Sequence, residues 1–176
     1  MKKIVLVTGG FDPIHSGHLA YFIAAKELGD ELWVGVNSDD WLTRKKDRAF
    51  MPLEERMEII SNLRMVDSVF SFDDSDDSAN RAISYALEKI KDEDNIIFAN
   101  GGDRNFESTP ESQNFDKNEK IKFIYGVGGN DKKNSSSKIL EDWKNTKTQR
   151  SWGWYRAFDE KKGIKVKELV IGPKSS

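Results

Sequence analysis

Two histidines, the only ones in the chain, lie close together in Gly9-Gly10-Phe11-Asp12-Pro13-Ile14-His15-Ser16-Gly17-His18. An imidazole can donate a hydrogen bond to a phosphoryl oxygen without the fixed charge of a lysine, and a pair of imidazoles can follow charge as it develops in a transition state. The glycines let a phosphate approach the backbone. Phosphate chemistry is therefore favoured over two alternatives. One is a purely structural pair, and the other is a metal site, for which no third His or Cys is available in the chain.

A second candidate anion site is Lys132-Lys133-Asn134-Ser135-Ser136-Ser137-Lys138. Three hydroxyl groups stand where a helix is predicted to begin, with lysines on either side, and a helix N-terminus attracts anions. An ordinary helix cap needs only one of these serines. The surplus favours phosphate binding over capping alone.

These side chains need a scaffold, and the hydrophobic pattern predicts one. Ile4 to Thr8 is a continuous apolar, mostly β-branched run that ends at a glycine pair, as expected of a strand buried on both faces of a parallel sheet. Four more strands are predicted at 31–36, 65–72, 95–99 and 121–125, with helices at 19–28, from Pro52, and at 79–91. Alternating strands and helices predict an α/β fold with a doubly wound, parallel five-stranded sheet of Rossmann-like type. Ligands of such sheets bind outside the carboxyl ends of the strands, where the histidines follow the first strand.

The acidic segment Asp73-Asp74-Ser75-Asp76-Asp77-Ser78 has two interpretations. It is most simply a solvated loop whose last residues cap the following helix. A divalent-cation site is the alternative, although the spacing does not match a calcium-binding loop.

The motifs, taken in chain order, resemble the cytidylyltransferase-like nucleotidyltransferases, whose signature is His-x-Gly-His after a Gly-Gly-Phe-Asp turn. Further blocks are similar to heptose-phosphate adenylyltransferases and glycerol-3-phosphate cytidylyltransferases. They are Gly35-Val36-Asn37-Ser38-Asp39, Pro52-Leu53-Glu54-Glu55-Arg56, Val66-Asp67-Ser68-Val69 and Gly101-Gly102-Asp103. The resemblance covers about residues 1 to 145, and it implies transfer of CMP or AMP from CTP or ATP to a sugar phosphate or polyol phosphate, with release of pyrophosphate.

The resemblance also implies a role for each matching residue. The catalytic set is His15, His18 and a lysine of the basic cluster Arg44-Lys45-Lys46-Asp47-Arg48, with Lys46 favoured and Lys45 the alternative. Nucleotide binding falls to Gly9, Gly10, Phe11, Asp12, Gly17, Arg56, Gly102, Asp103 and the turn Ser135-Ser136-Ser137, which would hold the β and γ phosphates. Acceptor binding falls to Asp39, Arg44, Lys45 and Arg104, with Asp103 also orienting an acceptor hydroxyl. Arg104 stands where the heptose enzymes carry Tyr and the glycerol enzymes Trp, so the acceptor is left open. Magnesium would arrive with the nucleotide, with Asp12 as an indirect ligand and no dedicated metal site.

Composition narrows the possible partners. Lys and Arg total 28 against 30 Asp and Glu, giving a net charge of -2, so no global positive field favours nucleic acid or an anionic membrane. The chain has no cysteine, which excludes disulfides and thiolate chemistry. The apolar run that begins at Ile4 is too short for a signal peptide or a membrane span, which predicts a cytoplasmic protein.

The final segment, 146–176, changes to an alternating, Trp-rich pattern that predicts a β-hairpin turning at Lys161-Lys162-Gly163. It resembles the opening strands of a mannose-6-phosphate isomerase-like cupin, without the metal-binding histidines. It is either the start of a truncated cupin or an element that docks on another surface, and a homodimer is expected. Two functional alternatives remain: an adenylyltransferase for a coenzyme precursor, and a non-catalytic nucleotide-binding or assembly subunit.

Overall fold

The computed structural model describes residues 1–102, 105, 107, 109–129, 135–144, 147–161 and 164–173. The chain divides into two compact units, Met1–Lys133 and Asn134–Ser176. Each unit is described by itself. The second unit opens with the helix Ser136–Lys144. The boundary between the two units precedes this helix, whereas the domain boundary predicted at 145/146 follows it.

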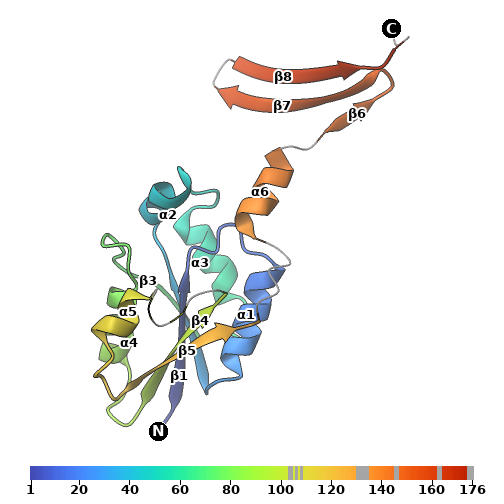
Figure 1. Ribbon diagram of the computed structural model, residues 1–176. Helices are drawn as coiled ribbons and strands as arrows, with labels where there is room; N and C mark the ends of the chain where they lie inside the picture. Colours follow the sequence, from blue (N-terminus) through green and yellow to red (C-terminus); the bar gives the residue numbers. More distant parts are fainter. Residues whose placement is uncertain are drawn as a thin grey trace. The chain divides into compact units, whose positions relative to one another are not determined.

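A five-stranded parallel sheet forms the centre of the first unit (Figure 1), in the order β3-β2-β1-β4-β5. Its strands are β1 (Lys3–Gly9), β2 (Glu31–Val36), β3 (Ser68–Ser71), β4 (Asn95–Gly101) and β5 (Ile121–Val127). The chain winds outward from β1 in both directions, so the strand order reverses between β1 and β4. Such a switch point is where doubly wound sheets bind ligands. The predicted fold class and all five predicted strands are confirmed.

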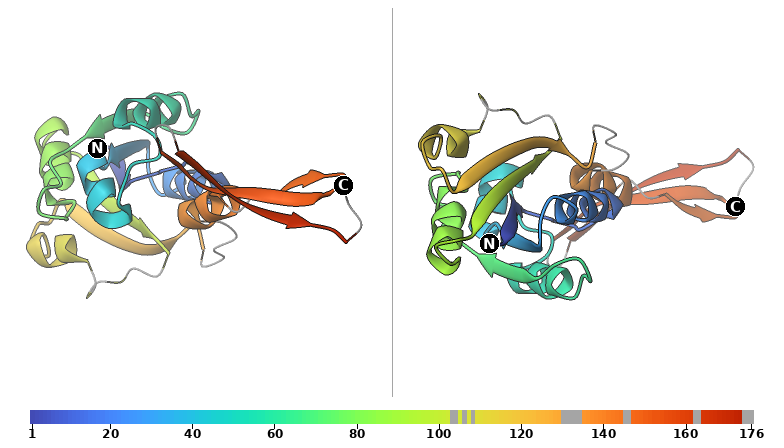
Figure 2. Two further views of the ribbon diagram at one scale, coloured as in Figure 1. Left: turned by 90° about the horizontal axis from the view of Figure 1, so that it is seen from above. Right: turned by 90° about the horizontal axis from the view of Figure 1, so that it is seen from below.

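Helices cover both faces of this sheet (Figure 2), with α1 (Ser16–Lys26) and α3 (Leu53–Ser61) on one face and α4 (Asn80–Lys89) on the other. Two short helices, α2 (Asp39–Lys46) and α5 (Pro110–Asn114), complete the unit. The strands read as continuous apolar runs because both faces are buried. Thus Val5 and Val7 pack on the α1 face, and Leu6 packs on the α4 face.

Helix α2 was not predicted, although its sequence carries the signals. The Ser38 hydroxyl accepts the Trp41 backbone N–H at 3.0 Å, acidic residues occupy the first turn and basic residues the last. Both charge placements complement the helix dipole. The helix was not predicted because its last turn is a dense basic run, and such a run is usually interpreted as a solvated surface segment.

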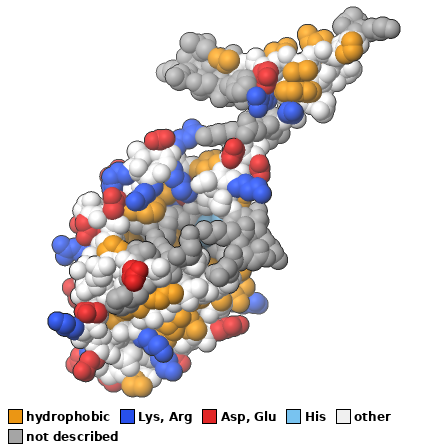
Figure 3. All heavy atoms as spheres, in the orientation of Figure 1, with side chains coloured by type: hydrophobic (Ala, Val, Ile, Leu, Met, Phe, Trp, Pro, Cys, Tyr) orange, Lys and Arg blue, Asp and Glu red, His pale blue; other side chains and the backbone are white. Residues whose placement is uncertain are grey.

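The second unit consists of α6 (Ser136–Lys144) and an antiparallel sheet in the order β6-β7-β8. The predicted hairpin is present as β7 (Gly153–Lys161) and β8 (Ile164–Ile171), and β6 (Thr148–Arg150) adds a third strand that the sequence did not reveal. Apolar side chains lie on the surface of this sheet (Figure 3), with Val166, Leu169, Val170 and Ile171 exposed. The cupin resemblance and the homodimer stay predictions.

Candidate active site

The two histidines close the first turn of α1. His15 is the N-cap residue, and its Nδ1 accepts the Gly17 N–H at 3.1 Å, while His18 Nδ1 accepts the His15 N–H at 3.3 Å. The two rings stack with centroids 3.8 Å apart. In a neutral imidazole whose Nδ1 accepts, the proton lies on Nε2. Each ring therefore presents an Nε2–H donor on the side away from its backbone contact, and within the described residues neither donor has a partner.

Both histidines are held in the neutral form. Burial, together with the nearby charges of His15 and Lys46, lowers the pKa of His18 to about 3. Burial also lowers the pKa of His15, again assisted by Lys46. At neutral pH the pair thus acts as two hydrogen-bond donors rather than as two cations.

This depressed pKa predicts a pH dependence of stability. Above the usual histidine pKa of 6.5 both the folded and the unfolded state are neutral at His18; below it only the unfolded state takes up the proton, until the folded state titrates near pH 3. The free energy of unfolding should therefore fall as the pH drops from 6.5 towards 4, with up to about 1.4 kcal/mol per pH unit due to His18. Urea denaturation at a series of pH values, compared between the wild type and His18→Asn, measures this share. Identical slopes for the two proteins would contradict the prediction.

The turn before α1 is tightly packed. A Cβ on Gly10 would lie 2.8 Å from Cδ2 of the buried Leu42, so a larger residue there would have to displace that side chain. Phe11 adopts a φ of 49°, a conformation that costs free energy for a residue with a Cβ. Its buried ring stands edge-on to His18 and to Phe22, at centroid distances of 5.2 and 5.0 Å. Phe11 thus packs against the His18 ring and helps to fix its position, and the nucleotide-binding role predicted for the turn stays a prediction.

The basic residues at the end of α2 contact different partners. Lys46 is half-buried, its Nζ donates to the Asp12 carbonyl oxygen at 3.2 Å, and its charge acts on both histidines. Burial lowers the pKa of Lys46, while Asp12 raises it. Exposed Lys45 instead lies over the Trp41 ring at 5.8 Å. The structure therefore brings Lys46, and not Lys45, to the histidines.

Arg44, predicted to bind the acceptor, contacts the acidic loop after β3. Its guanidinium donates to the Asp77 carboxylate and, at 2.7 Å, to the Asp74 carbonyl oxygen. The Asp74 carboxylate is itself buried and accepts bonds from the side chain of Asn37 and from both the backbone and the hydroxyl of Ser38. The acidic loop thus joins the ends of β2 and β3. This network supports the loop interpretation of the segment, and a direct contact of Arg44 with the acceptor stays a prediction.

Asp12 connects the histidine loop to the segment before α3. Its buried carboxylate accepts the backbone N–H groups of Phe50 and Met51 at 2.7 and 2.8 Å. Because each oxygen accepts a backbone N–H, Asp12 holds the two loops in register. Its nucleotide-binding role stays a prediction.

Replacing Asp12 with asparagine should therefore destabilise the protein. Asparagine keeps one acceptor oxygen but places an NH₂ group against the second backbone N–H, and a lost hydrogen bond to a charged group costs about 2 kcal/mol. Urea denaturation of Asp12→Asn measures the loss. Asp40→Asn, an exposed position in the first turn of α2, is the matched control and should cost only about 0.5 kcal/mol, the share of one exposed charge at a helix end. Equal stability of the two variants would contradict the assignment.

Arg56 is the most extensively bonded side chain of the site. Its fully buried guanidinium donates to the carbonyl oxygens of Gly10, Asn37 and Met51 and forms a 2.6 Å ion pair with Asp39. It thus joins the turns after β1 and β2 to the start of α3. The structure gives Arg56 and Asp39 a positioning role through these loops, and their predicted contacts with nucleotide and acceptor stay predictions.

The remaining predicted residues are placed only in part. Gly102 follows β4 with a φ of 71°, a left-handed conformation that favours glycine. Asp103, Arg104, Lys132 and Lys133 lie outside the described residues. Ser135, Ser136 and Ser137 belong to the second unit, where Ser135 Oγ accepts the Lys138 N–H at 3.1 Å and caps α6. Their role at the β and γ phosphates stays a prediction.

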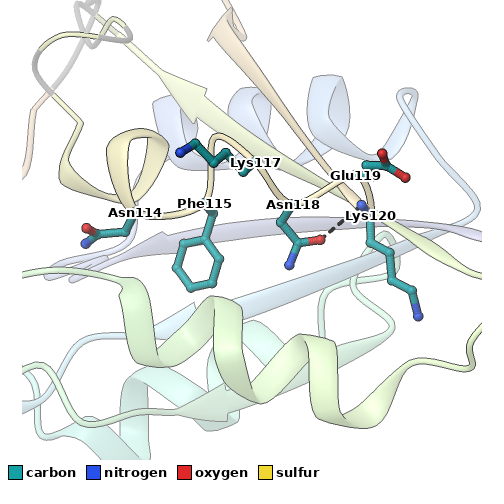
Figure 4. Close-up of a pocket in the computed structure, with 6 residues that line it drawn as sticks. All are labelled: Asn114, Phe115, Lys117, Asn118, Glu119 and Lys120. Carbon is teal, nitrogen blue, oxygen red and sulfur yellow. Dashed lines mark hydrogen bonds between the residues drawn. The ribbon is translucent and has the colours of Figure 1, made fainter.

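An open hollow of about 630 Å³ lies elsewhere in the first unit (Figure 4), lined by Asn114, Phe115, Lys117, Asn118, Glu119 and Lys120. This segment precedes β5, whereas the histidines follow β1, so the hollow lies at the opposite edge of the parallel sheet. It gathers no set of catalytic groups. Among the residues that the structure describes, no three His, Asp or Glu side chains gather into a metal-binding group, and no described helix is long and apolar enough to cross a membrane.

Residues 6–142 match the cytidylyltransferase-like family. The chain belongs to this family. The match extends over α6, which the division into compact units places with the C-terminal sheet. The family match is consistent with the His-x-Gly-His loop and with the strand order of the sheet.

Several known proteins are similar to this cytidylyltransferase-like chain. Bifunctional protein HldE of Enterobacter sp. (strain 638) is 38% identical over 116 residues, which is 58% of this chain and 24% of HldE. The HldE of Citrobacter koseri is 43% identical over 88 residues, which is 49% of this chain and 18% of that protein. The chain thus spans a quarter or less of the length of these relatives.

Solved structures of other proteins superimpose on this fold. The lipopolysaccharide core biosynthesis protein from Thermoplasma volcanium superimposes with a TM-score of 0.59 at 26% identity, covering 74% of this chain and all of that one. A bifunctional NMN adenylyltransferase/ADP ribose pyrophosphatase from Francisella tularensis, complexed with AMP and manganese, gives a TM-score of 0.60 at 16% identity, covering 82% of this chain and 42% of that one. The second likeness shows the fold alone.

Proposed function

We propose that this chain is a nucleotidyltransferase that joins a sugar phosphate or polyol phosphate to the nucleotidyl group of ATP or CTP. The observation that carries the proposal is the neutral His15–His18 pair, whose Nε2–H donors stand at the carboxyl end of β1 beside Lys46. Membership of the cytidylyltransferase-like family and the similarity to HldE support it.

In the proposed reaction a phosphate oxygen of the acceptor attacks the α-phosphorus of the nucleotide. One P–O bond forms, the bond between the α-phosphorus and the bridging oxygen breaks, and pyrophosphate leaves with that electron pair. The nucleophile is already an anion, so no general base is needed, and the barrier comes mainly from charge repulsion and positioning. Donors fixed in advance lower such a barrier because they need no reorganisation as negative charge builds up.

Each residue has a distinct part in this reaction. The Nε2–H groups of His15 and His18 donate to the oxygens of the transferring phosphate, and Lys46 adds positive charge beside them. Neutral donors bind the triphosphate less tightly in the ground state than two further cations beside Lys46 would. Asp12 and Arg56 hold the three loops that carry these groups.

Magnesium belongs to the substrate in this proposal, as the magnesium–nucleotide complex. Among the described residues, no three His, Asp or Glu side chains gather into a group that could hold a metal ion. Each oxygen of the Asp12 carboxylate accepts a backbone N–H. The phosphates themselves are the ligands that a hard cation prefers. The metal neutralises the leaving pyrophosphate when bound.

The deciding experiment measures pyrophosphate release with ATP, CTP, GTP and UTP against sugar 1-phosphates and glycerol 3-phosphate. Release with ATP or CTP, dependent on one acceptor, is expected. Tight nucleotide binding without pyrophosphate release from any pair would overturn the enzyme assignment and favour a nucleotide-binding subunit. Release with nicotinamide mononucleotide as the acceptor, and with no sugar phosphate, would move the chain to the coenzyme-precursor class.

A further inference from the structure

Four buried side-chain atoms lack a hydrogen-bond partner among the described residues, and all four belong to the α4 side of the sheet: Asn80 Oδ1, Asn100 Nδ2, Glu111 Oε2 and Tyr125 OH. Asn80 is the first residue of α4, and the other Glu111 oxygen accepts the Ala79 N–H. Because α4 follows β3, its first turn lies at the carboxyl edge of the sheet. Unpartnered polar groups are therefore concentrated at the ligand-binding edge.

Asn100 is the most informative of these residues. It is 4% exposed, and its buried Nδ2 has no hydrogen-bond partner within the described part of the chain. A buried amide without a partner destabilises a fold, so such a group calls for a functional explanation. Asn100 stands next to the end of β4, where the pairing with β5 shifts register, and β4 borders the switch point beside β1. Irregularities of this kind re-aim side chains near active sites.

Tyr125 faces the same side on the neighbouring strand. Phe98 packs in the α4 core, so Asn100, two residues later, points to that side as well. On β5, Phe123 packs in the same core, which places Tyr125 there too. The pairing of Ala99 with Ile124 and of Gly101 with Val127 sets Asn100 beside Tyr125. We call these two residues the β4–β5 polar pair.

The chemistry of this pair differs from that of the histidine site. An amide and a phenol are uncharged, and each both donates and accepts hydrogen bonds. The free oxygens of Asn80 and Glu111 add acceptors, and none of these four side chains is a cation. Such a set suits alcohol groups and does not suit phosphate. The histidines, on the α1 side, are the groups suited to phosphate.

We propose that the β4–β5 polar pair binds hydroxyl groups on the carbon skeleton of the phosphorylated acceptor and so selects a polyhydroxylated one. This inference rests on the proposed function. Asn100 and Tyr125 are then specificity-determining residues, distinct from those that act on the reacting phosphate. The unpartnered amide is retained because substrate hydroxyls complete its hydrogen bonds.

The test uses Asn100→Leu and Tyr125→Phe in the full chain, with the acceptor that reacts best in the pyrophosphate assay. Leucine has nearly the shape of asparagine and removes the unpaired amide, so its melting temperature should equal or exceed that of the wild type. The KM for the acceptor should rise about tenfold, as expected for a lost hydrogen bond. The KM for the nucleotide and kcat should change less than about twofold. Asn95→Leu, the same substitution at the other end of β4, is the control and should change none of these values.

A deoxy analogue of the acceptor sharpens the result. The wild type should prefer the acceptor that carries the hydroxyl, and Asn100→Leu should lose that preference. A fall in melting temperature with parallel changes in both KM values, or an unchanged acceptor KM, would overturn the proposal. If the wild type releases no pyrophosphate, the proposed function fails separately. Thermal shift with the same sugar phosphates then decides: stabilisation lost in Asn100→Leu supports the pair, and no stabilisation of the wild type overturns it.

Discussion

Replacing His18 with alanine is expected to lower kcat by about a hundredfold or more, the scale of losing one preorganised donor to a developing charge. His18 is the more buried member of the pair, its Nδ1 is committed to the His15 backbone, and its Nε2–H is the group left for the substrate. The KM for the nucleotide should change far less, because the donor acts mainly in the transition state. Steady-state pyrophosphate release measures both constants.

Alanine also removes the acceptor for the His15 N–H, so a second variant separates catalysis from helix capping. Asparagine at position 18 carries an oxygen that can take the place of Nδ1, yet it places no donor where Nε2 was. His18→Asn should therefore retain the melting temperature of the wild type and share the low kcat of His18→Ala. A folded His18→Asn protein with wild-type turnover would remove this histidine from the chemistry.

Replacing Lys46 with alanine should also lower kcat by about a hundredfold, since it removes the cation that lies beside both histidines. Lys46 is held in place by the Asp12 carbonyl oxygen, so its charge is preorganised as well. The KM for the nucleotide should also rise, because a cation attracts the triphosphate in the ground state too.

The chain offers its own control at the preceding residue. Lys45→Ala removes the same charge from the same turn of α2, but Lys45 is exposed over Trp41. Its kcat should stay within about twofold of the wild type, because the acceptor contact predicted for Lys45 would affect the KM for the acceptor and not kcat. Equal losses in the two variants would show that only the overall charge of the cluster matters.

Much of the fold was predictable because it depends on local patterns. A run such as Ile4 to Thr8 is short, mostly β-branched and ends at a glycine pair, which favours a strand buried on both faces, and alternating strands and helices leave few topologies. The position of the histidines at the carboxyl end of β1 followed from this arrangement alone. Phosphate binding at this glycine-rich turn before a helix is what backbone geometry favours, and it stays a prediction.

The parts that could not be predicted depend on contacts distant in sequence. Whether Lys45 or Lys46 faces the histidines depends on the rotation of α2, and α2 itself was not predicted. The bonds of Arg44 to Asp74 and Asp77 could not be predicted, because they join segments about thirty residues apart. The same holds for the bonds by which Arg56 joins three loops, while the substrate contacts of both arginines stay predictions. Asn100 gave no signal in the sequence, because a lone asparagine after a strand usually begins a turn.

The first turn of α1 limits how the site can change by mutation. Asparagine can imitate only the Nδ1 side of an imidazole, and glutamine, one methylene longer, only the Nε2 side. His18 uses both sides, one for the backbone and one as a donor, so no other single side chain replaces it without loss. A saturation library at position 18 should accordingly split into variants that fold without turning over and variants with weakened helices, leaving histidine as the sole residue that combines both properties.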